Sequence, residues 1–385
     1  MDFELAEEHR MLKDLAERFV KDGLMPLEGA VLKRDSEGKG AGLSAAEAEK
    51  VDKLSQEMGL WGLDAPADIG GMDLPIVAMI GVNEALGTTC VNYTLPPDSP
   101  NLRMLAATVT PRQRDAYLAP YVRGETISAI GISEPGAGAD PAGMITKAVK
   151  DGDDWVLNGR KIWISRAAEA DFTIVMAKTD GAKGRAGISA FLVDRDTPGF
   201  NVLRRIPMLA GAFTYEIALE DCRVPGWKLL GEEGNGFAPM QLRLGTRRME
   251  MAAWCIGIAR RSLDMMIEHA RQRKTFGALL AERQAIQWWI TDAATKIHAA
   301  RLMTYDCAWK LDRGKDVRTE ISMIKTYCTE MAYEIVDHAM QSFGAMGMTK
   351  ELPLYLFSQQ VRNMRIYDGP SEVHRFVVAR NLLRA

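Results

Sequence analysis

The spacing of hydrophobic residues changes twice along the 385-residue chain, and this change limits the possible folds more than any other feature. Up to about residue 124, apolar residues recur at intervals of three and four, as at Leu12, Leu15 and Phe19, which predicts amphipathic helices. Between about 126 and 236 they alternate in short β-branched runs, and after GEEGNGF the helical spacing returns. We therefore predict three domains: helical at 1–124, β at 125–236 and helical at 237–385.

Local signals refine this outline. Thr110 followed by Pro111 predicts the capped start of a helix. The stretch DGDDWVLNGRKIWIS, 151–165, predicts a hairpin closed by Asn158-Gly159. The last domain has long helical stretches near 237–273, 281–313, 317–343 and, as a final pair, 353–384. The expected fold class is thus α+β multidomain, with an N-terminal helical domain, a β-barrel-like middle domain and a C-terminal four-helix bundle.

Composition excludes several classes of function. The 48 basic and 51 acidic residues give a net charge of -3 without a basic run, so we expect no nucleic-acid partner. The five cysteines include no C-x-x-C and the five histidines no H-E-x-x-H, so we expect neither a disulfide framework nor a metal site. Because no apolar run approaches 18 residues and the N-terminus lacks signal-peptide features, we expect no membrane span and a cytoplasmic location.

Two familiar enzyme signatures fail on inspection. EPGAGAD contains Gly136-x-Gly138, but Pro141 stands where a dinucleotide fingerprint needs its third glycine. GISEPG has Pro135 where a nucleophile elbow needs glycine.

Two segments of the middle domain favour a ligand site, although each has an ordinary explanation. ISEPGAGAD, 132–140, is rich in small residues that let backbone N–H groups approach a flat or anionic ligand; the alternative is a plain turn. KIWIS, 161–165, places Trp163 and Ser165 on one face of a strand, where an indole and a hydroxyl can meet a planar ligand; the alternative is a core tryptophan.

Three segments of the last domain can likewise be interpreted as parts of a ligand site or as ordinary structure. The arginines of RQRKTFG, 271–277, suit a pyrophosphate or simply a solvated face. QSFGAMGM, 341–348, exposes backbone groups or is simply a helix C-cap. In YDGPSEVHR, 367–375, Asp368 is either a reactive carboxylate or a turn residue before a helix that begins near Pro370.

In their order and spacing, these five segments resemble the flavin-dependent acyl-CoA dehydrogenases over essentially the whole chain. The resemblance implies FAD as cofactor, a homotetramer, an acyl-CoA substrate and an electron-transfer flavoprotein as acceptor. It implies that Ile132, Ser133, Trp163 and Ser165 contact the flavin ring, with Ser165 near N5. The further cofactor-binding residues implied are Arg273 and Phe276, which reach the FAD of a neighbouring subunit, Gln341, Gly344 and Ala345 on its adenosine half, and Pro370 and Glu372.

The resemblance also implies a substrate site and a base. Its substrate-binding residues are Arg248, Tyr367, Gly369 and Arg380, and Asp368 removes the α proton while flavin N5 takes the β hydride. Most relatives have Glu-Gly-Thr where this chain has Asp-Gly-Pro, and some place their base at the position of Arg247, which is basic here. YDGPSEVHR and PDSPN, 97–101, instead resemble a branch with an aspartate base.

An aspartate base raises the question of the substrate. Aspartate is shorter than glutamate by one methylene, about 1.5 Å, so we expect an atypical acyl group, branched, cyclic or aromatic. Three alternatives stay open: an acyl-CoA oxidase, an enoyl-CoA reductase and a flavin-binding relative without catalysis.

Overall fold

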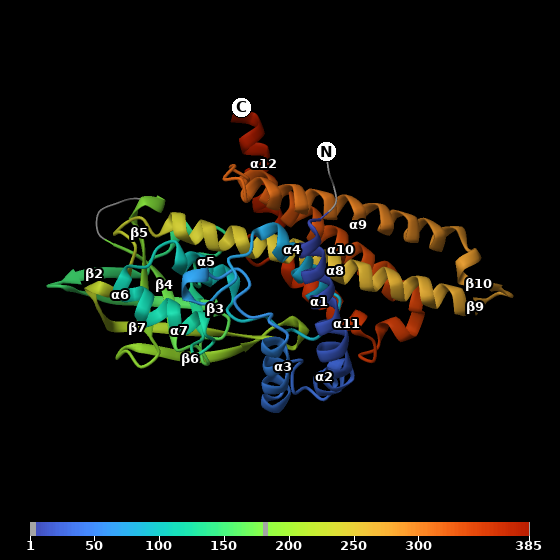
Figure 1. Ribbon diagram of the computed structural model, residues 1–385, viewed down its shortest axis with the longest axis horizontal. Coiled ribbons are helices and arrows are strands. Elements are labelled where there is room, and N and C mark those ends of the chain that lie inside the picture. The colour runs from blue at the N-terminus through green and yellow to red at the C-terminus, as the bar shows by residue number, and fades with distance from the viewer. Residues whose placement is uncertain (1–4, 180–183, 385) are drawn as a thin grey trace.

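The computed structural model describes residues 5–179 and 184–384, so residues 1–4, 180–183 and 385 of the predicted domains lie outside the described residues. Figure 1 shows a sheet domain at one end, a long helical bundle that extends to the other end, and the N-terminal helices packed at their junction. The N-terminal helices are α1 (Glu7–Phe19), α2 (Glu28–Ser36), α3 (Ala45–Glu57), α4 (Ile76–Leu86), α5 (Ser99–Ala106), α6 (Pro111–Gln113) and α7 (Ala119–Val122). The predicted cap is confirmed, because the Thr110 side chain accepts a hydrogen bond from the Gln113 backbone N–H.

The middle domain is one eight-stranded sheet in the order β6-β7-β3-β2-β4-β5-β8, with β1 pairing parallel to β4. Its strands are β1 (Ser128–Gly131), β2 (Lys147–Asp151), β3 (Asp154–Ile164), β4 (Phe172–Lys178), β5 (Ile188–Asp194), β6 (Phe200–Pro207), β7 (Phe213–Pro225) and β8 (Leu229–Leu230). β4 and β5 are buried along nearly their whole length, as expected for the centre of a sheet covered on both faces.

The predicted position of the hairpin turn is wrong. β2 and β3 are joined at Gly152-Asp153, where Gly152 has a φ of 62°. Asn158-Gly159 lies inside β3, and the register against β7 shifts between Leu157 and Gly159. Asn-Gly therefore forms a β-bulge, the other common use of glycine in a strand.

The predicted C-terminal helices are confirmed. They are α8 (Phe237–Gln272), α9 (Gln284–Leu311), α10 (Arg318–Phe343), α11 (Pro353–Met364) and α12 (Ser371–Arg384), with the short strands β9 (Lys274–Thr275) and β10 (Ala278–Leu279) between α8 and α9. At 1.5 Å per residue the 36 residues of α8 span about 54 Å. It runs from the sheet to the β9–β10 tip at the far end of the bundle (Figure 1).

One hydrophobic core joins the N-terminal helices to the bundle, and two smaller clusters pack on the sheet. α4 and α8 approach closely: a Cβ added to Gly257 would collide with the backbone oxygen of Glu84, and one on Gly87 with the backbone of Trp254. Only glycine permits this separation of the two helices. The close packing fixes α4 against the polar face of α8 described below.

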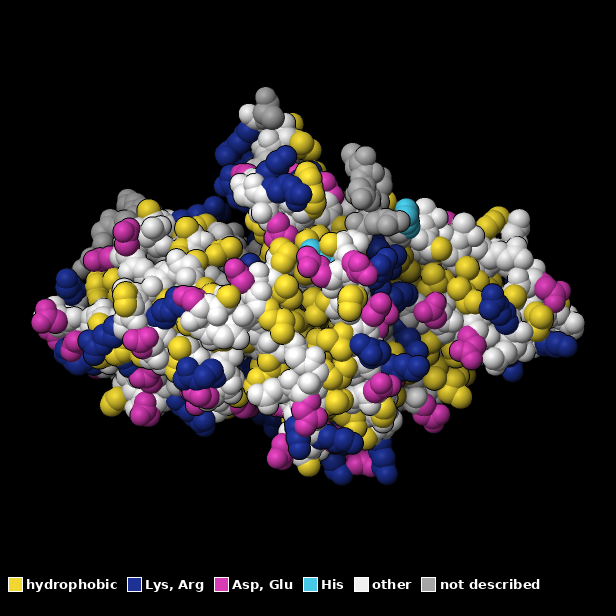
Figure 2. All heavy atoms as spheres, in the orientation of Figure 1, with side chains coloured by type: hydrophobic (Ala, Val, Ile, Leu, Met, Phe, Trp, Pro, Cys, Tyr) yellow, Lys and Arg dark blue, Asp and Glu magenta, His cyan; other side chains and the backbone are white. Residues whose placement is uncertain are grey.

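The surface carries apolar side chains over the junction and the bundle (Figure 2). Exposed large residues of the bundle include Trp288, Leu302, Trp309, Tyr333 and Phe376. Across residues 5–179 and 184–384, no helix combines the length and the hydrophobicity that a membrane span requires.

Candidate functional site

Asp368 lies in the turn between α11 and α12, and three side chains hold the backbone of this turn in place. Its φ is 53°, in the left-handed region that few non-glycine residues adopt. Arg248 Nε of α8 donates to the Asp368 carbonyl at 2.8 Å, and a His374 ring nitrogen lies 3.3 Å from the same oxygen. Lys325 Nζ of α10 donates to the Gly369 carbonyl at 2.6 Å. The turn is thus fixed by cationic side chains of two bundle helices as well as by its own residues.

Gly369 is required by this turn. Its φ is 102°, and a Cβ added there would lie 2.8 Å from His374 Nε2. Burial lowers the pKa of His374 to about 3, assisted by the positive charges of Arg248 and Lys325, so its ring is neutral at physiological pH. The turn interpretation of the sequence is confirmed for the shape of this segment.

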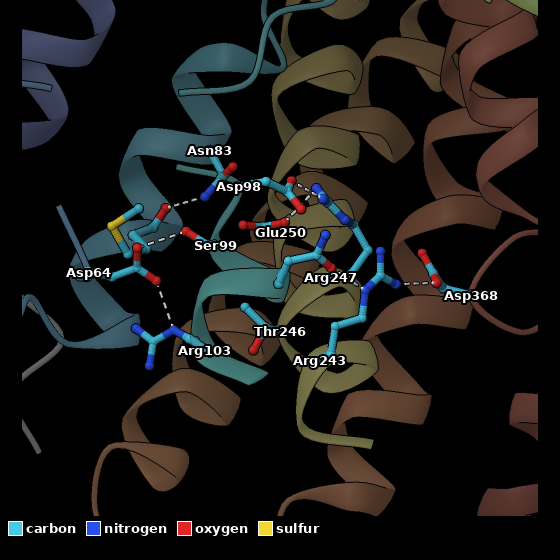
Figure 3. A network of polar contacts seen from close by, with 12 residues as sticks. Asp64, Asn83, Asp98, Ser99, Arg103, Arg243, Thr246, Arg247, Glu250 and Asp368 are labelled. Atoms are coloured by element: carbon cyan, nitrogen blue, oxygen red, sulfur yellow. Dashed lines mark hydrogen bonds and ion pairs between the residues drawn. The ribbon is translucent and has the colours of Figure 1, made fainter. Parts of the chain in front are cut away.

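The Asp368 carboxylate forms an ion pair with Arg243 of α8, at 3.0 Å between Oδ1 and a guanidinium nitrogen (Figure 3). Both side chains are largely buried, with 11% of Arg243 and 15% of Asp368 exposed. Arg243 Nε also donates to Asn101 at 3.2 Å, and Asn101 donates to Ser128 of β1 at 2.9 Å. These contacts connect the carboxylate to the strand that leads into ISEPGAGAD.

Arg243 was not among the residues predicted from the sequence, although a signal for it was available. Arg243 and Arg247 are four residues apart on α8, so both lie on the same face of the helix.

Arg247 belongs to a second buried cluster beside the first. Its guanidinium pairs with Asp98 and, at 2.7 Å, with Glu250 (Figure 3). Burial opposes ionisation of Asp98, but the charges of Arg247 and Arg243 outweigh it and hold the pKa of Asp98 below its usual value. For Glu250, burial dominates and raises its pKa to about 8, so it is mainly protonated at neutral pH. Asp98 and Asn101 both come from the PDSPN segment and face the arginines of α8.

A small cavity lies between α4, α5 and α8, next to this cluster. Its lining combines apolar with buried polar side chains: Ile76, Met79, Ile80 and Met249, and Asp64, Asn83, Ser99, Thr246 and Glu250. Asp64 is already engaged, since it accepts from Ser99 and from Arg103, each at 2.8 Å. The lining of this cavity is therefore partly polar.

The structure brings ISEPGAGAD and KIWIS together. The Ile162 N–H donates to the Ser133 carbonyl at 3.0 Å. The completely buried Lys161 ammonium donates to the Ile132 carbonyl at 3.2 Å and to Glu134 at 2.8 Å. These contacts support the loop from the core side.

The outer side of the same segments fits a planar ligand such as FAD. Trp163 is 51% exposed with a φ of 64°, so the interpretation as a core tryptophan is wrong, and Ser165 is exposed beside it. A Cβ added at Gly136 or Gly138 would have no atom within 4 Å, which leaves the loop open to close approach. An exposed indole and a hydroxyl can contact a flavin ring, and an open loop of small residues lets the backbone approach it.

Five further predicted cofactor residues lie near the far end of α8. Arg273 and Phe276 are on the β9–β10 hairpin, where Phe276 is fully exposed. Gln341, Gly344 and Ala345 are exposed at the end of α10, which contacts the end of α8 through a stack of His269 on Phe343 with ring centroids 4.1 Å apart. The length of α8 separates this group from Arg243 and Asp368 within one chain.

The last predicted residues surround the Asp368 turn. Tyr367, Gly369, Pro370 and the exposed Glu372 are its immediate neighbours, so the structure groups them with the carboxylate. Arg380 lies further along α12, with its guanidinium 5.5 Å from the centroid of Phe376.

Comparisons with known proteins agree with this arrangement. The chain matches the acyl-CoA dehydrogenase N-terminal domain over residues 6–125, the middle domain over 129–222 and the C-terminal domain over 234–383. It is 41% identical to (R)-benzylsuccinyl-CoA dehydrogenase of Thauera aromatica, covering 100% of this chain and 97% of the relative.

Solved structures agree as well. Butyryl-CoA dehydrogenase of Megasphaera elsdenii superposes with a TM-score of 0.88 at 30% identity, and the FAD complex of PigA with a TM-score of 0.89 at 29%, each over 100% of both chains. The predicted fold class is thereby confirmed. The protein belongs to the acyl-CoA dehydrogenase family, flavoprotein oxidoreductases that use FAD and act on the CH–CH groups of acyl-CoA thioesters.

Proposed function

We propose that this enzyme removes hydrogen from the α and β carbons of an acyl-CoA thioester with a branched, cyclic or aromatic acyl group, and that Asp368 is the base. The observation that carries the proposal is the Asp368 turn. Its carbonyl is held by Arg248, and among the described residues its backbone N–H donates to no acceptor. One residue thus offers a carboxylate for the α proton and a free N–H for the thioester oxygen.

The Asp368 carboxylate and backbone N–H together provide what removal of the α proton requires. An α C–H is a weak acid, so negative charge on the thioester oxygen must be stabilised while the proton leaves. The Asp368 N–H donates to that oxygen, and the carboxylate accepts the proton. The rival base position holds Arg247, which is engaged with Asp98 and Glu250, and this supports Asp368 in the role.

The residues around the turn hold cofactor and substrate in this proposal. When bound, FAD accepts the hydrogen and electron pair that leave the β carbon. Ile132, Ser133, Trp163 and Ser165 hold its ring, with Pro370 and Glu372 nearby. A second copy of the chain, in a homotetramer, supplies Arg273, Phe276, Gln341, Gly344 and Ala345, because these lie too far from Asp368 of their own chain. Arg248, Tyr367, Gly369 and Arg380 contact the acyl-CoA.

The atypical acyl group is supported by the short base. A misplacement near 1 Å can cost about 10²-fold in rate, so a substrate of different shape is needed to meet aspartate. The name of the benzylsuccinyl-CoA relative agrees with a branched aromatic substrate.

A panel of CoA thioesters tests this function through bleaching of the bound flavin. We expect a cyclic, branched or aromatic thioester to bleach it with a higher kcat/KM than butyryl- or octanoyl-CoA. The reverse order would refute the proposal of an atypical acyl group. Bleaching followed by reduction of an electron-transfer flavoprotein supports a dehydrogenase, whereas rapid peroxide release supports an oxidase. Faster conversion of the enoyl-CoA in the opposite direction supports a reductase.

The Asp368→Asn variant tests the base. We expect it to keep its yellow cofactor and to lose at least about 10²-fold in the rate of bleaching, because the amide cannot accept the proton. The matched control is Asp221→Asn on β7, an exposed aspartate with a similar left-handed φ of 47°. An unchanged rate in Asp368→Asn would exclude Asp368 as the base and the flavin-linked mechanism built on it.

A further inference from the structure

We propose that Arg243 makes this enzyme specific for acyl groups that carry a second, free carboxylate, an inference that rests on the proposed function. In the absence of substrate Arg243 pairs with the Asp368 carboxylate; with substrate, it binds the free carboxylate of the acyl group and releases the base.

The position of Arg243 limits what its ligand can be. Its guanidinium is 3.0 Å from the Asp368 carboxylate, and only 11% of its side chain is exposed. The part of a CoA thioester next to the reacting carboxylate is the acyl group, since the α carbon must reach Asp368. A ligand of Arg243 therefore belongs to the acyl group and not to the phosphates of CoA.

The charges of this region favour an anion. Arg243, Arg247 and Arg248 lie within two turns of α8, and among the described residues Asp98 and Asp368 form ion pairs with Arg247 and Arg243. Glu250 contributes little negative charge at neutral pH, because burial keeps it mainly protonated. Lys325 adds a further cationic group at the same turn. An uncompensated buried positive charge is costly, and a carboxylate of the substrate removes that cost.

The Arg243–Asp368 pair also opposes the proposed chemistry. A proton delivered to Asp368 would neutralise the partner of a buried guanidinium and leave it unpaired. An uncharged acyl chain offers Arg243 no replacement. A substrate carboxylate does, because a guanidinium forms strong charge-assisted bonds to any carboxylate in reach. One ion pair is then exchanged for another, and Asp368 is free to accept the α proton.

The experiment compares matched pairs of CoA thioesters: an acyl group that ends in a carboxylate, and the same group with that carboxylate converted to its methyl ester. Flavin bleaching gives kcat/KM for each, and calorimetric titration of the holoenzyme with the corresponding enoyl-CoA products gives their Kd. For the wild-type enzyme we expect a preference for the carboxylate of about 10- to 100-fold in both measurements.

Arg243→Gln is expected to reduce this preference to less than about threefold, and Arg243→Lys to retain part of it because the positive charge remains. The matched control is Arg260→Gln, which removes an arginine 17 residues further along the same helix that pairs with Glu17 and Glu84. This control should keep the full preference. If Arg243→Gln does not fold with FAD, the inference is tested by Arg243→Lys, in which the preference for the carboxylate should be partly lost.

The inference is overturned if wild-type enzyme bleaches with both members of each pair equally well, or if the Arg243 variants keep the wild-type preference. Either result leaves the proposed dehydrogenation intact, since bleaching itself occurs. Absence of bleaching with every thioester would instead refute the proposed function. A change in the preference cannot come from a structural defect alone, because such a defect affects both members of a pair.

Discussion

Replacing Lys161 by methionine should destabilise the protein and weaken FAD binding, because Lys161 supports the ISEPGAGAD loop from inside. The ammonium is completely buried and donates to Glu134 at 2.8 Å and to the Ile132 carbonyl at 3.2 Å. Glu134 is itself buried, and methionine leaves its carboxylate without a cation. Breaking one side of a buried ion pair costs about 3–5 kcal/mol.

Other contacts moderate this cost. Glu134 also accepts hydrogen bonds from the backbone N–H groups of Ile145 and Thr146, at 2.6 and 3.0 Å. These bonds compensate part of the lost charge pairing, so we expect a loss at the lower end, about 3 kcal/mol. Exchanging both partners, in Lys161→Met with Glu134→Gln, should recover about half of it, because no unpaired charge then remains.

The assay is guanidinium denaturation of the holoenzyme followed by tryptophan fluorescence, together with FAD release on dilution. Lys147→Met on neighbouring β2 is the control, since this lysine is exposed and should change stability by less than about 0.5 kcal/mol. A loss below about 1 kcal/mol in Lys161→Met, with unchanged FAD affinity, would refute the reasoning that this pair supports the flavin loop.

Two other predictions concern the Arg247 cluster and the Asp368 turn. The pKa of Glu250 is raised to about 8, so its stabilising contribution is complete below pH about 4.5 and is lost as the pH rises through 8. Glu250→Gln should therefore flatten the decline of the melting temperature between pH 6 and 9, and an unchanged slope would contradict the assigned protonation. In Gly369→Ala, the new side chain must adopt a φ of 102° and would clash with His374. We expect the free energy of unfolding to fall by about 1–3 kcal/mol and kcat to fall as well. A wild-type free energy of unfolding and a wild-type kcat would show that the turn can accommodate alanine.

Much of the architecture could be predicted because local spacing encodes it. The long helices of the last domain carry an apolar pattern that their packing requires, and the Thr110 cap depends on residues three apart. Asn158-Gly159 shows the limit of such local signals. The same dipeptide suits a tight turn and a bulge, and the pairing of β3 with β7, more than 50 residues away, selects the bulge.

The sequence by itself determined the order of the three domains through the spacing of its hydrophobic residues, and the family, the cofactor and the candidate base through the order of its short motifs. Only the tertiary structure decided how Asp368 is held and paired. Its partners Arg243 and Arg248 come from α8. Lys325 of α10 binds the carbonyl of the next residue, Gly369, and Asn101 of the N-terminal domain binds Arg243. Charge pairing depends on distance in space and on burial, and neither is encoded in the spacing of residues along the chain.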